Sequence, residues 1–253
     1  MIYNIRGTSG SGKTYLVRQL VNAYGGTEIL GEVDNPLGKT YIFGYRLPRN
    51  LLVLGRYDDA IKGGGVDNIT APLYKRYLAH GWVGNSMDAV EAQVRKWAQL
   101  GHHVLFEGII VTSVWGRWVK LAADEPVHFL FLDTPLEVCY QRVLERSGGR
   151  SPKGWADGKS DLHAKHSGTQ KQLASIMRKD EEVKRRQSSM EDFHNRQHAR
   201  HLPSAVTGGL HYTVLDYSQA FEQLVAILHE EIGFPLNAAG VVGGASGLGA
   251  VGG

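Results

Sequence analysis

The segment of this chain that most clearly predicts chemistry is a glycine-rich stretch near residue 10. Residues 7–14 read GTSGSGKT and match the pattern G-x-x-x-x-G-K-[ST] at every position. Glycines allow successive backbone N–H groups to point at one anion, and the following helix adds the positive end of its dipole. The residues predicted to bind a nucleoside triphosphate are Gly7, Thr8, Ser9, Gly10, Ser11, Gly12, Lys13 and Thr14.

Two side chains of this loop have specific expected roles. Lys13 is expected to contact the β- and γ-phosphates, and the Thr14 hydroxyl is expected to bind Mg²⁺. We expect Lys13 to be exposed while the loop is empty, so that it stabilises charge only when phosphates are present. The alternative is a glycine-rich loop that binds nothing.

Acidic residues follow two of the apolar runs that are predicted to be buried strands. Glu107 follows residues 103–106, at the edge of an α/β sheet where ligands bind, and Gly108 permits close approach. Glu107 is a candidate to hold Mg²⁺ with Thr14, or to accept a proton from an attacking hydroxyl. The alternative is a capping or surface glutamate. Asp133 follows the second run, and its simplest role is to cap the next helix.

Three arginines recur every four residues after Pro135. Arg142 and Arg146 share a helix face, and Arg150 leads into residues 148–167, which read as a flexible loop. Mobile arginines beside a phosphate loop suit a kinase lid, because phosphoryl transfer spreads negative charge over the transferred oxygens. The alternative is a set of ordinary surface arginines.

Two aspartates flank a glycine run after the strand predicted at residues 51–56. Asp58 or Asp67 is a candidate to orient or deprotonate an acceptor hydroxyl, against the alternative that both form turns. The histidines give no convincing zinc site, because His163 and His166 lack a third close ligand.

The elements that must position these side chains alternate between strand and helix. Strands are predicted at 2–6, 40–47, 51–56, 103–106, 128–132 and 211–215, with a hairpin joining 40–47 to 51–56. Helices are predicted at 13–24, 87–100, 135–144, 169–201 and 218–232. This alternation predicts an α/β fold with a parallel sheet and helices on both faces. Together with the motif at residues 7–14 and the lid arginines, it is expected to be a nucleotide-kinase-like P-loop fold.

Composition supports one globular domain over residues 1–235, expected from the motifs to be a P-loop kinase domain, followed by a flexible glycine-rich tail at 236–253. The chain has 253 residues and a formal charge of +3, and its single cysteine excludes a disulfide framework. Its 42% apolar and 21% charged residues exclude a wholly disordered chain. Residues 142–201 hold 14 Lys and Arg against eight Asp and Glu, so this basic lid or helical insertion is expected to face an anion. Neither a signal peptide nor a membrane span is visible, so a cytoplasmic protein is expected.

The motifs together resemble a family of bacteriophage P-loop kinases. The resemblance rests on residues 4–14 (NIRGTSGSGKT), on residues 54–58 (LGRYD) with Gly63, Gly64 and Asp67, and on residues 103–108 (HVLFEG). It covers about residues 1–150. Some members are 5-hydroxymethyluracil DNA kinases, which act in thymidine hypermodification in the host cytoplasm. Their cysteine pair around the two glycines has no counterpart in residues 62–66 (KGGGV).

The resemblance implies a kinase that uses ATP and Mg²⁺ and phosphorylates 5-hydroxymethyluracil in DNA. Its catalytic residues would be Lys13, Asp67, Glu107, Arg142 and Arg146. The acceptor base would have to leave the duplex stack, while the basic segment contacts phosphates. A nucleoside or nucleoside-monophosphate kinase is the alternative. A P-loop motor or switch ATPase is disfavoured, because no Asp-Glu pair ends a strand.

Overall fold

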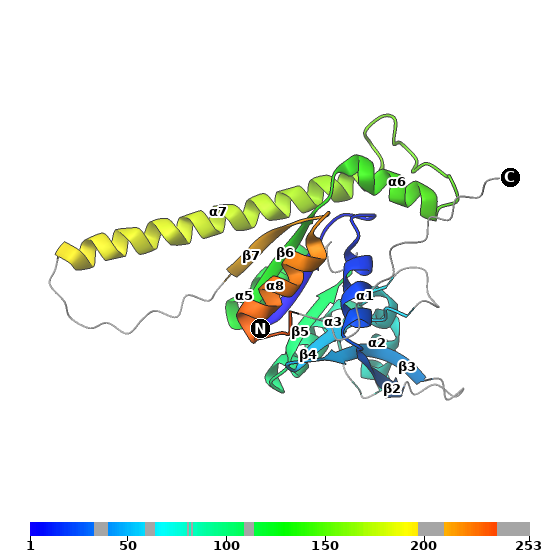
Figure 1. Ribbon diagram of the computed structural model, residues 1–253, viewed down its shortest axis with the longest axis horizontal. Coiled ribbons are helices and arrows are strands. Elements are labelled where there is room, and N and C mark those ends of the chain that lie inside the picture. The colour runs from blue at the N-terminus through cyan, green and yellow to red at the C-terminus, as the bar shows by residue number, and fades with distance from the viewer. Residues whose placement is uncertain are drawn as a thin grey trace.

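The computed structural model describes residues 1–32, 40–58, 64–79, 81, 83–108, 114–196 and 210–236. A seven-stranded sheet with the order β2-β3-β4-β5-β1-β6-β7 runs through them (Figure 1). The strands are β1 (Ile2–Arg6), β2 (Thr27–Glu32), β3 (Thr40–Leu47), β4 (Leu51–Leu54), β5 (His103–Glu107), β6 (Val127–Asp133) and β7 (Leu210–Asp216). The helices are α1 (Lys13–Ala23), α2 (Asp67–Ala79), α3 (Ser86–Gln99), α5 (Trp115–Asp124), α6 (Leu136–Arg146), α7 (Asp161–Arg196) and α8 (Ala220–Ile232).

The sheet is mixed: it has the predicted parallel strands and, at one side, antiparallel strands that include the predicted hairpin. Strands β4, β5, β1, β6 and β7 pair in parallel, whereas β3 pairs antiparallel with both β2 and β4. The predicted hairpin is confirmed, with Leu47 opposite Leu51 and positive φ angles at Arg49 and Asn50 in its turn. Strand β2 was not predicted. The α/β class and the helices on both faces are confirmed.

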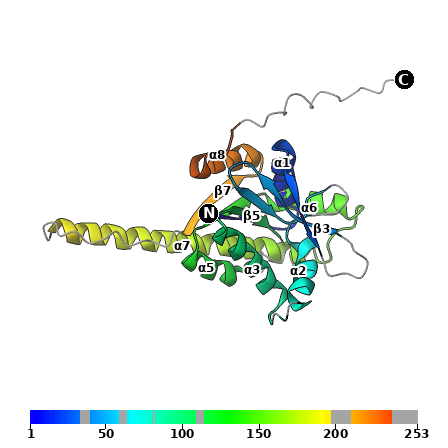
Figure 2. The ribbon, with the colours of Figure 1, turned by 90° about the horizontal axis from the view of Figure 1, so that it is seen from below.

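The two faces of the sheet bury separate apolar cores. Tyr3 and Ile5 of β1 lie in the core beneath α1 and α8, and Ile2 lies in the core beneath α2, α3, α5 and α7. Figure 2 shows α1 and α8 on one side of the sheet and α2, α3 and α5 on the other. Because alternate residues of a strand face opposite sides, one short strand anchors both layers.

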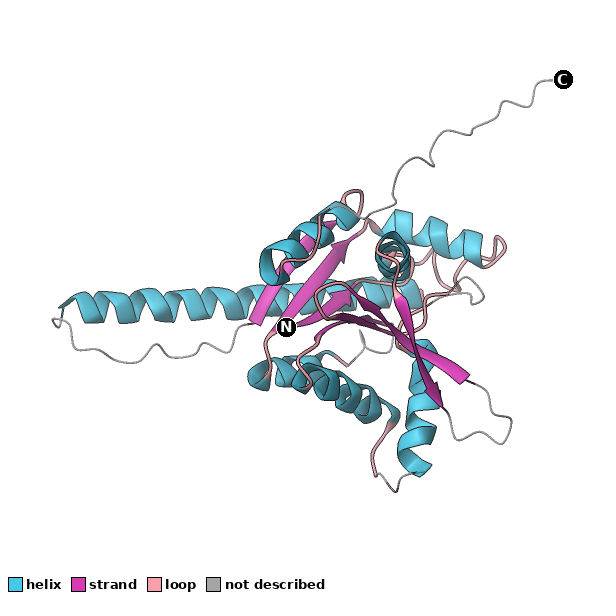
Figure 3. Ribbon diagram, turned by 60° about the horizontal axis from the view of Figure 1, so that its bottom comes forward, coloured by secondary structure: helices cyan, strands magenta, loops and turns pink. Residues whose placement is uncertain are grey.

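Helix α7 begins at Asp161, eight residues before the predicted start, so the expected loop ends at residue 160. Leu162, Thr169 and Ile176 are buried at intervals of seven residues, which keeps them on one side of the helix. Beyond them the helix extends past β7 (Figures 1 and 3). Residues 197–201 of the predicted helix and residues 237–253 of the predicted tail lie outside the described residues. None of the described helices is long and apolar enough to cross a membrane.

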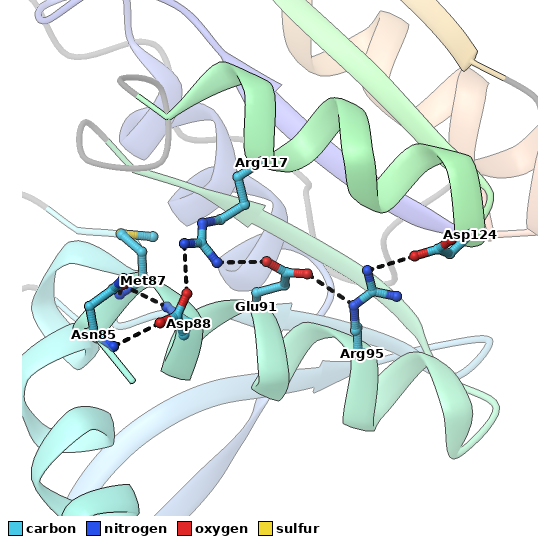
Figure 4. Close-up of polar contacts among 7 residues, drawn as sticks. All are labelled: Asn85, Met87, Asp88, Glu91, Arg95, Arg117 and Asp124. Carbon is cyan, nitrogen blue, oxygen red and sulfur yellow. Dashed lines mark hydrogen bonds and ion pairs between the residues drawn. The ribbon is translucent and has the colours of Figure 1, made fainter. Parts of the chain in front are cut away.

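A polar network ties α3 to α5 (Figure 4). Arg117 of α5 pairs with Asp88 at 2.6 Å and with Glu91 at 2.8 Å, and Arg95 bridges Glu91 and Asp124 at 3.0 Å each. Asp88 also belongs to the capping box of α3 with Asn85. The network holds together the two helices that cover one face of β5 and β1.

We expect Arg117→Ala to lower the free energy of unfolding by about 0.5–1 kcal/mol at neutral pH, the usual size for a partly exposed ion pair. The hydrogen bond from the Asn85 backbone, helped by Arg117, lowers the pKa of Asp88 in the folded state. Stabilisation by this carboxylate is therefore present above its unfolded pKa of about 3.9 and is lost as the pH falls through the lower folded pKa. Urea unfolding at about pH 7 and about pH 2.5 measures the effect.

Lys120→Ala is the matched control, because Lys120 is an exposed cation on the same helix. It should leave stability unchanged at both pH values. A loss in the Arg117 variant that is equally large at both pH values would contradict the assignment to carboxylate pairing.

Candidate active site

The phosphate loop joins β1 to α1 and leaves the first turn of α1 open. Gly12 is the N-cap, with a φ of 103°, and neither a side-chain cap nor an acidic residue occupies this turn. Gly10 has a φ of 80°, and a Cβ there would lie 2.4 Å from the carbonyl oxygen of Cys139 on α6. The loop therefore needs glycine at residue 10 both for its backbone conformation and for its packing against α6.

The Lys13 side chain is buried, so the expectation that it is exposed in the empty loop is wrong. Its ammonium donates to the carbonyl oxygens of Gly7 at 2.7 Å and Thr8 at 2.9 Å, and to Ser11 Oγ at 3.4 Å. Burial lowers the pKa of Lys13, although the Glu107 carboxylate opposes the shift. Lys13 thus closes the loop on itself, and an arriving phosphate competes with these carbonyls for the ammonium.

Glu107 lies at the end of β5, only 2% exposed. Thr14 donates its hydroxyl to Glu107 Oε1 at 3.0 Å, which unites two residues that are 93 positions apart. Burial raises the pKa of Glu107, while the Lys13 charge and the Thr14 hydrogen bond lower it and Asp67 raises it further. The predicted proximity of Thr14 and Glu107 is confirmed, and the alternative of a surface glutamate is excluded.

The loop before α2 packs closely over this carboxylate. Gly65 has a φ of 84°, and a Cβ there would lie 2.4 Å from Glu107 Oε1. The backbone N–H of Val66 donates to the carbonyl oxygen of Glu107 at 3.0 Å. Asp67 follows as the first residue of α2, with its carboxylate against Gly108. The two carboxylates of Asp67 and Glu107 therefore line one cavity.

Asp58, the other candidate to contact an acceptor, is held elsewhere. Its carboxylate pairs with Arg56 and does not line the cavity that contains Glu107. Arg18 of α1 donates to the carbonyl oxygens of Tyr57 at 2.9 Å and Asp58 at 3.4 Å, which fixes this segment to α1. Of the two aspartates, the structure places only Asp67 beside the phosphate loop.

The three predicted lid arginines have different surroundings. Arg142 donates to the carbonyl oxygens of Gly10 at 3.3 Å and Ser11 at 3.0 Å, and its guanidinium lies over the Tyr217 ring. Arg146 lines the cavity that contains Glu107. Arg150 lies beyond the end of α6, donates to the Ser147 carbonyl and does not line that cavity. Arg142 and Arg146 are thus beside the loop as predicted.

Residues 148–160, within the predicted flexible loop, make defined contacts. The Trp155 ring stacks on Tyr140 of α6 at 3.9 Å and packs against His163 of α7 at 4.4 Å. His163 also hydrogen bonds with Ser160 at 2.7 Å. In the described part of the chain, no group of three His, Cys, Asp or Glu side chains could hold a metal ion.

Asp133 does not cap α6, which corrects that interpretation. The N-cap of α6 is Pro135, without a side-chain cap, and Asp133 is exposed. Thr134 binds the phosphate loop instead, donating to the Ser11 carbonyl at 2.9 Å.

Two cavities meet at the phosphate loop. The first, about 530 Å³, contains Lys13, Thr14, Asp67, Glu107 and Arg146. The second, about 450 Å³, lies between α1 and the loop after β7. Gly12, Tyr15 and Arg142 line both cavities.

Among the cavity-lining residues that sequence reasoning missed are Tyr15, Arg18, Asn68, Tyr217 and Phe221. Spacing on the helix could have identified Arg18, one turn after Thr14. The position of Tyr217, just after a strand at the carboxyl edge of the sheet, was also a usable signal. Tyr15, Asn68 and Phe221 carry no comparable motif.

The chain is similar to known phage proteins over the residues that build this site. A model of the 5-hmdU DNA kinase family matches residues 1–156. The 5-hmdU DNA kinase of Pseudomonas phage M6 is 34% identical over 171 residues, which span 63% of this chain and 78% of the relative. That of Pseudomonas phage PaMx11 is 35% identical over 156 residues, 60% of this chain and 71% of the relative.

The 5-hmdU DNA kinase 1 of Salmonella phage ViI is 30% identical over 154 residues, 58% of this chain and 60% of the relative. The family match contains the phosphate loop, Asp67, Glu107 and both arginines of α6, and it ends before α7. It covers more than half of the chain and confirms the resemblance predicted over residues 1–150. The chain therefore belongs to the 5-hmdU DNA kinase family.

Proposed function

We propose that this kinase transfers the γ-phosphoryl group of ATP to the hydroxymethyl oxygen of 5-hydroxymethyluracil in DNA. The names of the relatives support this acceptor. The observation that carries the proposal is one cavity that unites the phosphate loop, two carboxylates and two lid arginines. Phosphoryl transfer to an alcohol needs these groups: a phosphate cradle, an acid–base group beside the acceptor, and cations for the transferred oxygens.

The chain offers separate cavities for the phosphates and for the purine of ATP. The open first turn of α1 and Lys13 would hold the phosphates, together with the backbone of residues 7–12. The second cavity would hold the purine, because the rings of Tyr217 and Phe221 supply apolar surface and Arg142 a planar cation. Arg142 lines both cavities, so it would contact the donor where base and phosphates meet.

The oxygen atoms beside the loop fit Mg²⁺. This ion commonly takes one or two protein oxygens, with phosphates and water completing its shell. The Thr14 hydroxyl would hold it, and the Glu107 carboxylate, 3.0 Å from that hydroxyl, would hold it through a Mg²⁺-bound water. When bound, Mg²⁺ neutralises charge on the β- and γ-phosphates.

In the transfer step the hydroxymethyl oxygen attacks the γ-phosphorus. An O–P bond forms to the acceptor, the bond from the γ-phosphorus to the bridging oxygen breaks, and ADP leaves with that electron pair. Glu107 accepts the hydroxyl proton, and Asp67 orients the hydroxyl from the start of α2. Lys13, Arg142 and Arg146 stabilise charge on the transferred oxygens.

The acceptor proposed here is a base within DNA, which must leave the stack to reach the cavity. Helix α7 lies outside the family match and extends from the body of the protein (Figure 1). Together with the lid it makes up residues 142–196 of the basic segment 142–201, which would contact backbone phosphates in a single kinase domain spanning residues 1–235. A nucleoside-monophosphate kinase is the second candidate, favoured by arginines 142 and 146 on a lid helix.

Transfer of labelled γ-phosphate to a panel of acceptors tests the proposed function. The panel contains DNA with 5-hydroxymethyluracil, the same DNA with thymine, and free hydroxymethylated nucleotides. Label should enter only the hydroxymethylated DNA. Lys13→Ala should retain less than about a tenth of the wild-type rate. Because Lys13 also closes the loop, the melting temperature of the Lys13→Ala variant must be measured together with its transfer rate. Transfer to free nucleotides alone would favour the second candidate.

Glu107→Gln should lower kcat by about 10²–10⁴, the range for loss of a general base, while ATP binding persists. In the wild-type enzyme the raised pKa of Glu107 predicts that kcat/KM falls with decreasing pH already above the ordinary glutamate range near about 4.3. Asp67→Asn should shift this acid limb to lower pH, because the Asp67 charge raises the pKa of Glu107. Unchanged turnover in the Glu107 variant would move the base role to Asp67.

Neutralising Lys184, Arg185 and Arg186 on the far half of α7 should weaken binding to every DNA sequence. Each lost phosphate contact should reduce the slope of log K against log salt by about 0.7–0.9. KM for ATP should hardly change. A matched control neutralises Lys75, Lys96 and Lys120, which are exposed on α2, α3 and α5. Equal weakening of DNA binding by both triple variants would indicate a general charge effect and contradict a specific role for α7.

A further inference from the structure

Two side chains in the wall of the first cavity have no role in the transfer step. Tyr15 follows Thr14 on α1 and is 70% exposed. Asn68 follows Asp67 on α2 and is also exposed. Both line the cavity that contains Glu107. Among the residues that the structure describes, neither the phenol of Tyr15 nor the amide of Asn68 has a hydrogen-bond partner. An aromatic ring and an unpaired amide are thus presented to whatever enters.

This pair matches the two surfaces of an unstacked pyrimidine. The faces of a base stack on aromatic side chains, and its Watson–Crick edge is read by hydrogen bonds. Uracil presents its O4 acceptor beside its N3–H donor. An asparagine amide carries a donor beside an acceptor and can complement both groups.

The position of Asn68 next to Asp67 fits the arrangement of atoms on the ring. The hydroxymethyl group is attached to C5, and O4 is attached to the adjacent ring atom C4. A base whose hydroxymethyl group faces Asp67 therefore turns its O4 and N3–H edge to a neighbouring side chain. The backbone N–H of Asn68 donates to the Gly65 carbonyl at 3.3 Å, which fixes this turn of α2.

We infer that Asn68 selects the acceptor base by pairing with its O4 and N3–H edge while the Tyr15 ring stacks on its face. This inference rests on the proposed function, because it names how the same cavity recognises the hydroxymethylated base. Neither residue acts on the phosphates. Asn68 determines which pyrimidine is accepted, and Tyr15 determines how tightly any extruded base is held.

The test compares kcat/KM on two DNA strands that differ in one residue, 5-hydroxymethyluracil or 5-hydroxymethylcytosine. Asn68→Asp leaves only acceptors, which repel O4 of uracil but pair with the 4-amino group of cytosine. The ratio of uracil to cytosine activity should fall by about tenfold or more, the effect of one base-edge contact. Asn68→Ala should lower both activities. Ala71→Asp is the control, since it adds the same charge one turn along at an exposed position outside the cavity.

Substitutions of Tyr15 test the stacking part separately. Tyr15→Ala should raise KM for both DNA strands by about tenfold, and Tyr15→Phe should restore wild-type KM, because stacking needs the ring and not the hydroxyl. The KM for ATP is the discriminating measurement, because Tyr15 also lines the second cavity. If Tyr15→Ala raises KM for ATP and leaves KM for DNA unchanged, the ring stacks on the donor and that part of the inference is overturned.

The outcomes separate this inference from the proposed function. Wild-type enzyme that transfers no phosphate to either DNA overturns the proposed function, and base selection with it. Wild-type enzyme that is active, with an unchanged ratio in a folded Asn68→Asp variant, overturns base selection alone. Melting temperature and KM for ATP establish folding, and Asn68→Ser serves as the milder variant if the aspartate destabilises α2.

Discussion

The site depends on a buried carboxylate that is held beside a buried ammonium. Glu107 and Lys13 are both nearly inaccessible to water, and each charge offsets part of the desolvation that the other suffers. The order of the strands makes this possible, because β5 is the direct neighbour of β1 and ends level with the start of the phosphate loop. Strand β6 pairs with the other edge of β1, so the phosphate loop follows the strand at which the strand order reverses. Ligands of α/β folds bind at such a point.

The buried pair of Lys13 and Glu107 also restricts which groups can pack against the Glu107 carboxylate. A group that packs on a buried carboxylate must be small or must donate a hydrogen bond. A larger apolar group would exclude water from the carboxylate without replacing the lost hydrogen bonds, and the buried charge would become more costly. Gly65 meets the first condition and the hydroxyl of Thr14 the second. The glycine run after β4 therefore lets α2 begin at the carboxylate, and this places Asp67 and Asn68 in the cavity wall. The arrangement of α2 in the cavity wall thus follows from the electrostatics of the buried Lys13–Glu107 pair.

The sequence predicted the features that depend on local pattern. The phosphate-loop motif, the position of Glu107 at a strand end, the two arginines of α6 and the hairpin all follow from spacing within short segments. It did not predict the burial of Lys13, because the carbonyls of Gly7 and Thr8 that bind its ammonium are set by loop geometry. The early start of α7 was missed because its first turns are polar, and they are held in place by Leu162 in the core and by His163 against Trp155. Tertiary contacts decided these points, and no local pattern reports them.

Helix α7 is joined to the active site through the strand that enters the phosphate loop. Arg6, the last residue of β1, donates to the Gln172 side-chain oxygen of α7 at 2.8 and 3.0 Å and lies over the Trp115 ring. Burial lowers the pKa of Arg6 to about 9, so this cation is costly to keep in the core and its hydrogen bonds are costly to break. The first half of α7 is therefore fixed by Leu162, Thr169, Ile176 and Gln172, and cannot shift without disturbing β1. The second half of α7 extends beyond the sheet, so the proposed contact with DNA phosphates would fall on the part of the helix that is not fixed to β1 (Figure 1).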